Sequence, residues 1–159
     1  MRGRVHQVSV SKGGVPKMPV PRAAVSATGL SGDAQNDTKH HGGPERAVCL
    51  FSLDVIERLR GEGHPIAPGS VGENLTITGI DWSTVAPGGR FEFEGGVVLE
   101  VSSYTKPCST IRDSFAGLEF KRILQDAHPG ESRVYTRVIT PGPIAPGAWV
   151  TYRAPATTP

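Results

Sequence analysis

The chain has 159 residues, which is enough for a single domain with one hydrophobic core. Its 17 basic and 15 acidic side chains nearly balance, which excludes a protein whose main partner is the phosphate backbone of a nucleic acid. Two cysteines exclude the disulfide framework of a small secreted domain, and no apolar stretch is long enough for a signal peptide or a membrane span, so a reduced, cytoplasmic setting is expected.

Twenty glycines and fourteen prolines favour short strands joined by tight turns, because few windows of the sequence show helical periodicity. The predicted fold class is mainly β with short helices. Val5, Val8 and Val10 alternate with polar residues and predict an opening strand, which is followed by a loop over residues 11–19. Pro21 then keeps the segment after it from being a central strand, since proline has no N–H to donate.

A short apolar run, Ala47–Phe51, predicts a buried segment followed by a helix. Ser52 is a suitable N-cap, and apolar residues recur on one face as far as about Arg60. Gly61 and Gly63 are expected to end this helix.

Three turns share the sequence Ala-Pro-Gly, in which proline fixes φ at the first corner and glycine takes the positive φ of the second. They lie at residues 67–69, 86–88 and 145–147. The last two lead into predicted strands at residues 90–93 and 148–152. We expect one domain over residues 1–153, followed by a frayed tail at residues 154–159.

The turn at residues 94–96 predicts a hairpin whose second strand covers residues 97–102. This strand leads directly to Cys108, which therefore lies just beyond a strand end. Residues 110–124 are helical in places, and residues 134–139 form a further strand.

The polar run over residues 32–46 contains no apolar side chain larger than alanine or proline, so it does not fill a core. Its residues hydrogen-bond, ionise or bend the backbone instead. Further along the chain, Lys106 precedes Pro107-Cys108. Together these segments pair one soft, ionisable sulfur with a loop suited to an anion.

With these segments in view, the chain resembles the MOSC domain, named after the C-terminal domain of molybdenum-cofactor sulfurases. The matching pieces occur in the family's order and are Gly32-Asp33, His41-Gly42-Gly43-Pro44 with Arg46-Ala47-Val48, Gly72-Glu73-Asn74-Leu75-Thr76, Pro107-Cys108 and Arg137-Val138. Two departures are Thr105, where many members carry arginine, and Arg133-Val134, where members often have Gly-Trp.

The resemblance implies a compact MOSC-type β-barrel that binds molybdenum cofactor, a pterin whose dithiolene holds the metal and which carries a phosphate. In stand-alone bacterial members, a cysteine matching Cys108 is the protein ligand to molybdenum, which agrees with the preference of soft metals for thiolate. The alternative for Cys108 is a small buried hydrophobic residue. Cys49 lies within the apolar run and is predicted to be core.

His40 and His41 lie near two aspartates, which suggests a separate metal site. Adjacent residues of an extended chain point to opposite sides, so one ion would not easily use both imidazoles. The favoured interpretation places His41 at the cofactor or substrate, with Gly42 and Gly43 allowing the backbone to approach a bulky ligand. A turn with solvated histidines is the alternative.

Glu73 and Asn74 precede a predicted strand and have two interpretations. Asn74 could hydrogen-bond the pterin and Glu73 could order a catalytic loop or relay a proton, or both could satisfy amides of the turn. The basic residues near the matching pieces are candidates for binding the cofactor phosphate. Each of these residues could equally be a solvated surface charge. They are Lys39, Arg46, Lys106, Arg112 and Arg137.

The leading hypothesis is a molybdenum-dependent oxidoreductase that reduces N-hydroxylated or other N-oxygenated small molecules. A separate electron-donor protein is expected, because the sequence has neither a G-x-G-x-x-G fingerprint nor a cysteine cluster for iron–sulfur. The first alternative is a module that carries molybdenum cofactor or sulfur without turnover. The second is a β-barrel interaction domain without a cofactor.

Overall fold

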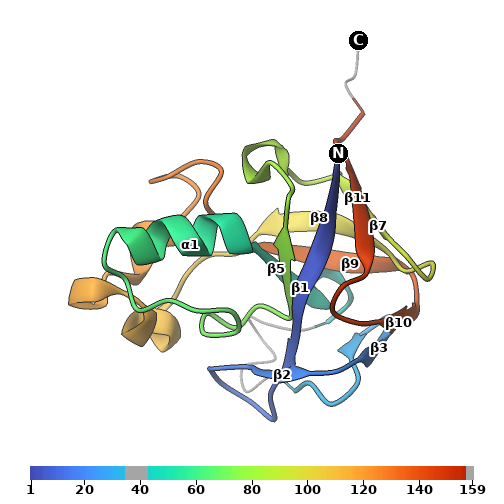
Figure 1. The fold of residues 1–159 in the computed structure, drawn as a ribbon, viewed down its shortest axis with the longest axis horizontal. Helices are drawn as coiled ribbons and strands as arrows, with labels where there is room; N and C mark the ends of the chain where they lie inside the picture. The colour runs from blue at the N-terminus through green and yellow to red at the C-terminus, as the bar shows by residue number, and fades with distance from the viewer. Residues whose placement is uncertain (35–42, 157–159) are drawn as a thin grey trace.

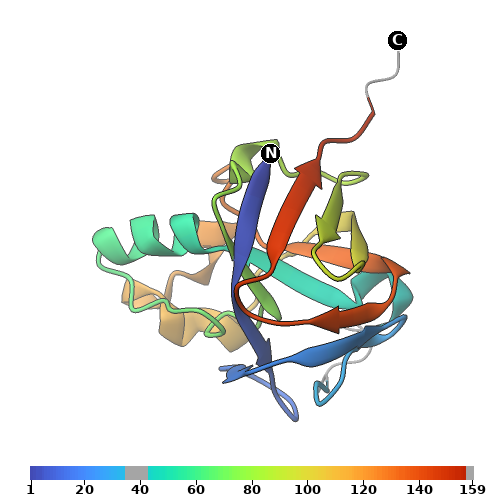
Figure 2. The same cartoon turned by 45° about the vertical axis from the view of Figure 1, so that its right-hand side comes forward.

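The structure, a computed structural model, describes residues 1–34 and 43–156. Seven strands of one sheet close into a barrel, because the first strand pairs with the last (Figures 1 and 2). In their order around the barrel they are β1 (Arg2–Val10), β6 (Leu75–Thr78), β5 (Val48–Ser52), β9 (Val134–Thr140), β8 (Val98–Tyr104), β7 (Arg90–Phe93) and β11 (Trp149–Arg153). The predicted mainly β barrel is confirmed.

Short strands extend the barrel at one end. The strand β2 (Met18–Val20) pairs with the end of β1. A separate small sheet has the order β10 (Gly142–Ile144), β3 (Ala23–Ser26) and β4 (Gly29–Leu30). The expectation that no central strand follows Pro21 is wrong for this sheet, since β3 is paired on both sides. Pro21 lies before the first residue of β3, so its missing N–H removes no bond from the ladder.

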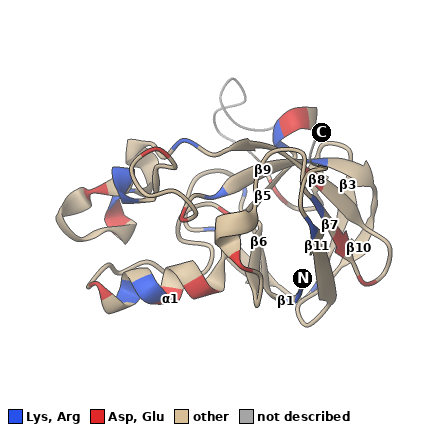
Figure 3. Cartoon of the chain, turned by 90° about the horizontal axis from the view of Figure 1, so that it is seen from above, with Lys and Arg blue, Asp and Glu red and all other residues tan. Residues whose placement is uncertain are grey.

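The pairing of β5 with β6 is parallel, and the helix α1 (Leu53–Gly61) begins the crossover between them. Ser52 caps this helix, because its hydroxyl accepts a hydrogen bond from the N–H of Val55 at 3.2 Å. Apolar side chains on one face of α1 are buried, and the helix lies outside the barrel (Figure 1). Charges of both signs are intermixed along α1 (Figure 3), with basic residues in its last turn, where they complement the helix dipole.

The expected partly helical segment after β8 consists of three short 3₁₀ helices, Ser109–Ser114, Ala116–Leu118 and Phe120–Ile123. It is tied to the end of α1 by Arg122, whose guanidinium pairs with Glu62 at 2.9 Å and also contacts Glu131. Two further 3₁₀ helices cover Pro44–Arg46 and Trp82–Thr84.

The turn predictions are confirmed. Gly69, Gly88 and Gly147 have φ of 83°, 91° and 88°, as the second corner of a type II turn requires. The hairpin of β7 and β8 is antiparallel, with Phe91 opposite Leu99. Both of these side chains are fully buried inside the barrel. Within the described residues, none of the helices has the length and apolar character needed to cross a bilayer.

Candidate functional site

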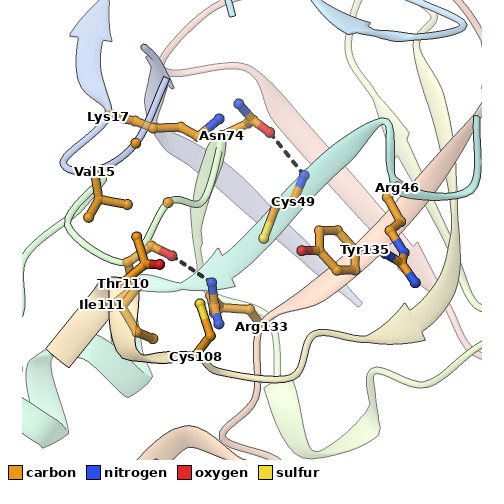
Figure 4. A pocket seen from close by; sticks show the side chains of 13 residues that line it. Val15, Lys17, Arg46, Cys49, Asn74, Cys108, Thr110, Ile111, Arg133 and Tyr135 are labelled. Atoms are coloured by element: carbon orange, nitrogen blue, oxygen red, sulfur yellow. Dashed lines mark hydrogen bonds between the residues drawn. The ribbon is translucent and has the colours of Figure 1, made fainter. Parts of the chain in front are cut away.

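A cavity of about 230 Å³ is bounded by loops at the end of the barrel and by the strands β5 and β9 (Figure 4). Its wall is made by residues within the stretches 14–17, 46–49, 71–74, 108–111 and 133–135. The first, third and fourth of these stretches are loops or the start of a 3₁₀ helix, whereas the other two enter strands. The cavity therefore gathers side chains that are far apart in the sequence.

Cys108 lies in this wall, at the residue that precedes the 3₁₀ helix Ser109–Ser114. Its backbone is extended, its side chain is half-buried and its sulfur points into the cavity (Figure 4). The thiol is free. The predicted position just beyond the strand β8 is confirmed, and a soft donor is thus accessible from a ligand-sized space.

Cys49 is buried, as predicted, but its side chain belongs to the wall of the same cavity. Its sulfur lies 3.9 Å from the hydroxyl oxygen of Thr105. Burial raises the pKa of the Cys49 thiol, and the positive charge of Arg133 opposes this shift. The sequence could not show this role, because every residue of β5 is buried and only the fold reveals which face borders the cavity.

Arg133 is the wall residue that the sequence analysis treated only as a departure from the family pattern. Its side chain is 5 % exposed, and one terminal nitrogen, Nη1, donates to the carbonyl of Val71 at 2.6 Å. Among the residues that the structure describes, none accepts a hydrogen bond from its Nε. A charged residue directly before the buried start of β9 was the signal available in the sequence.

Glu73 is fully buried and lies behind the wall, whose lining includes its neighbours Gly72 and Asn74. One carboxylate oxygen accepts a hydrogen bond from the hydroxyl of Thr76 at 3.1 Å, and the other, Oε1, has no partner within the described part of the chain. Burial raises the pKa of Glu73 to about 7, and the nearby backbone groups of Gly69 and of Glu73 itself partly oppose this shift without meeting the geometry of full hydrogen bonds. The predicted catalytic role of Glu73 therefore belongs to a carboxyl group that does not itself line the cavity.

Asn74 contributes to the wall, but its side-chain amide is occupied by the protein. Its oxygen accepts from the N–H of Cys49 at 3.0 Å, and its nitrogen donates to the carbonyl of Ser9 at 3.2 Å and to Asp33 at 2.9 Å. The side chain of Asn74 thus connects segments of the protein itself, and its hydrogen bond to a pterin stays a prediction.

Lys17 is a second buried cation in the wall that the sequence analysis did not single out. Its ammonium group is 2.8 Å from both carboxylate oxygens of Asp33. Asp33 also accepts from the backbone N–H of Ser11 at 3.0 Å. This ion pair is 5 % exposed on each side and holds the loop after β1 against the cavity.

The predicted phosphate-binding residues divide into two groups. Arg46 lines the cavity, with its guanidinium carbon 5.7 Å from the ring centre of Tyr135. Lys106 and Arg112 are exposed outside the wall, and Arg137 pairs with Glu45 and Glu100 at 3.1 and 2.9 Å.

The remaining predicted site residues lie at or beyond a gap in the description. Gly43 precedes the 3₁₀ helix Pro44–Arg46 with φ of 81°, outside the cavity wall. Lys39, His41 and Gly42 lie outside the described residues. In the part of the chain that is described, no three His, Cys, Asp or Glu side chains come together as a metal site would require.

The profile of the MOSC domain family matches residues 37–151. This chain belongs to the MOSC domain family. MOSC domains are associated with molybdenum cofactor in general. The half-buried thiol of Cys108 and the orphaned Nε of buried Arg133 fit such a group, because one is a soft donor and the other a donor for an anion.

Relatives by sequence are longer than this MOSC chain. The uncharacterized protein YflK of Bacillus subtilis is 31% identical over 140 residues, which cover 85% of this chain and 61% of YflK. Protein YiiM of Escherichia coli is 29% identical over 124 residues, covering 76% of this chain and 54% of YiiM. A protein named reductase from Gibberella moniliformis is 32% identical over 127 residues, covering 77% of this chain and 22% of its own length.

Solved structures share the MOSC fold. The YuaD protein of Bacillus subtilis superposes with a TM-score of 0.75 over 97% of both chains, at 16% sequence identity. YiiM from Geobacillus stearothermophilus gives a TM-score of 0.71 at 25% identity, over 95% of this chain and 75% of its own. The chain thus shares its overall fold with these solved structures.

Proposed function

We propose that this MOSC chain binds molybdenum cofactor and reduces N-hydroxylated or other N-oxygenated small molecules. The observation that carries the proposal is the sulfur of Cys108, half-buried and directed into a cavity that also contains a buried guanidinium. The relative named reductase supports a redox role. When bound, the cofactor supplies a metal centre that exchanges an oxygen atom and two electrons.

The side chains of this chain have separate tasks in that proposal. Cys108 holds the metal as a thiolate, and Arg133 holds a negatively charged part of the ligand. Glu73 stands behind the wall and keeps a proton on its carboxyl group for part of the time at neutral pH, given its pKa of about 7. Conversion of a hydroxylamine to an amine and water consumes two electrons and two protons, so a source of both is needed.

A separate donor protein supplies the electrons, and the substrate is a small molecule that enters the cavity. The free state of both cysteines agrees with a reduced, cytoplasmic setting.

The test compares wild type, Cys108→Ser and Cys49→Ser after expression of the full chain in a host that makes the cofactor. We expect molybdenum and pterin in wild type and in Cys49→Ser, and loss of molybdenum in Cys108→Ser. The loaded wild type should reduce a hydroxylamine with an artificial electron donor. Retention of molybdenum by Cys108→Ser would show that the ligand is assigned to the wrong sulfur.

One observation favours a second function. Cys49 and Cys108 line the same cavity, and two thiols in one pocket suit a protein that handles sulfur or carries the cofactor without turnover. In that case the loaded protein would transfer cofactor or sulfur to an acceptor enzyme and would not reduce the hydroxylamine.

A further inference from the structure

The two buried cations of the cavity are balanced differently. Lys17 is matched by Asp33, which contacts it through both carboxylate oxygens at 2.8 Å. Arg133 is equally buried, yet no described residue gives it an ion pair, and its guanidinium donates to the neutral carbonyl of Val71. Among the described residues, the cavity therefore contains one buried positive charge that has no ion-pair partner.

Glu73 does not fill this role. Its carboxylate lies behind the wall, where one oxygen accepts from Thr76 and the other has no partner among the described residues. Burial is the main cause that raises the pKa of Glu73 to about 7, and the charge of Arg133 opposes this shift less than the nearby backbone groups and the hydrogen bond from Thr76 do. A buried guanidinium held only by a carbonyl is costly unless something else completes its hydrogen bonds.

The direction of the Arg133 side chain indicates which group completes its hydrogen bonds. Arg133 belongs to the cavity wall, and Figure 4 shows its guanidinium and the sulfur of Cys108 pointing into the same end of the cavity. Its Nη1 is fixed on Val71 at 2.6 Å, so the planar group is held in place before any ligand arrives. A guanidinium with free N–H groups in a preorganised position binds carboxylate and phosphate oxygens best.

We propose that Arg133 is a binding residue for a negatively charged oxygen group of the cavity's ligand, a phosphate or a carboxylate, beside Cys108. Two sources provide this chemistry. One is the phosphate of the cofactor, and the other is an acidic group on the substrate. Both of these assignments rest on the proposed function. Binding of an anion to the cofactor-free protein does not depend on it.

The first experiment uses the full chain expressed without cofactor and inorganic phosphate as the probe. We expect phosphate to raise the unfolding midpoint of wild type, and Arg133→Gln to weaken phosphate binding by roughly tenfold or more. Arg153→Gln is the matched control, because it removes an exposed arginine that pairs with Glu92 on the far strands β11 and β7. Arg133→Lys retains a positive charge but lacks the planar guanidinium with its paired N–H donors, so it should bind phosphate with intermediate affinity.

Stability separates binding from a structural role. Without phosphate, Arg133→Gln should unfold at the same midpoint as wild type or a higher one, because the variant no longer buries an unmatched charge. If the bond to Val71 were the purpose of the side chain, the variant would be less stable and phosphate would act on it as on wild type. Arg133→Lys covers the case in which the glutamine variant does not fold.

The second experiment uses cofactor-loaded protein and assigns the source. Loss of molybdenum and pterin from Arg133→Gln would identify the cofactor phosphate. Retained molybdenum, with loss of a wild-type preference for 4-carboxybenzamidoxime over benzamidoxime in kcat/KM, would identify an acidic substrate. Equal phosphate binding by Arg133→Gln and Arg153→Gln, or no binding by wild type, would overturn the proposal even if the loaded protein is an active reductase.

Discussion

Asn74 holds the backbone of Cys49 at two points. The side-chain oxygen of Asn74 accepts from the N–H of Cys49 at 3.0 Å, and the backbone N–H of Asn74 donates to the carbonyl of Cys49 at 2.7 Å. The contact lies where the parallel strands β5 and β6 begin to pair, so one residue fixes both the strand register and a thiol of the cavity.

Asn74→Ala should lower the free energy of unfolding by about 2–3 kcal/mol, because it leaves the N–H of Cys49 and the carbonyl of Ser9 buried without partners. Asn74→Asp is the matched variant. It keeps the acceptor for Cys49 but turns a carboxylate toward Asp33, so its loss of stability should shrink as the pH is lowered. Chemical denaturation at two pH values measures the stability of both variants. Unfolding free energies equal to that of wild type would contradict a stabilising role for the Asn74 side chain.

Gly69 and Gly147 occupy the same position in two Ala-Pro-Gly turns but have different surroundings. A Cβ on Gly69 would lie 2.2 Å from the carbonyl oxygen of Lys17, whereas a Cβ on Gly147 would meet no atom of the described residues within 4 Å. Gly147→Ala should cost about 1–2 kcal/mol from its positive φ alone. Gly69→Ala should cost at least about 2 kcal/mol more, since Lys17 must move. Equal unfolding free energies for the two variants would refute this difference.

Glu73 should make the unfolding free energy depend on pH. Its pKa is about 7 in the folded protein against an ordinary value of 4.5, so the folded state binds more protons than the unfolded chain between these values. The contribution of Glu73 is therefore most favourable below about pH 4.5 and falls as the pH rises to about 7, by about 3 kcal/mol at most.

Glu73→Gln removes this titration and serves as the comparison. Denaturation of both proteins at pH 5 and pH 8 should show the variant gaining stability relative to wild type at the higher pH. A difference between the two proteins that stays constant with pH would mean that Glu73 has an ordinary pKa.

The two thiols should react at different rates. Cys108 is half-buried, whereas Cys49 is buried and its pKa is raised by burial, which keeps it protonated. In the folded protein at pH 8, iodoacetamide should label Cys108 about tenfold or more faster than Cys49, as mass spectrometry of the peptides would show. The unfolded protein provides the control, in which both cysteines should react at similar rates. Faster labelling of Cys49 would contradict the described geometry.

The sequence was sufficient for features that depend on local chemistry. Proline followed by glycine predicted the turns at Gly69, Gly88 and Gly147, and Ser52 predicted the start of α1. The position of Cys108 just beyond a strand followed from the hairpin that precedes it. These predictions needed only the nearest neighbours along the chain.

The rest of the site depends on contacts between distant segments. Arg133 becomes a cavity residue because the loop at Val71 meets it, 62 positions away in sequence. Cys49 was correctly predicted to be buried, but its facing the cavity follows from the order of the barrel strands. Among the predicted cations, Arg137 has the right charge, yet its partners are Glu45 and Glu100. Charge alone does not tell which basic side chains converge.

The cavity wall consists partly of strand residues and partly of residues in connecting segments. Substitutions in the connecting segments can therefore alter ligand preference with less effect on folding than substitutions in the strands. Gly14 and Val15 belong to a loop, and Thr110 and Ile111 to a short 3₁₀ turn, so none of them takes part in the pairing that closes the barrel. Thr110 is exposed and Val15 is only partly buried, so exchange at these two positions should change what the cavity accepts while the barrel stays intact. Gly14 has a positive φ and Ile111 is buried in the core, so libraries for altered selectivity would start at Val15 and Thr110 rather than at Cys49 or Tyr135, whose strands carry the barrel.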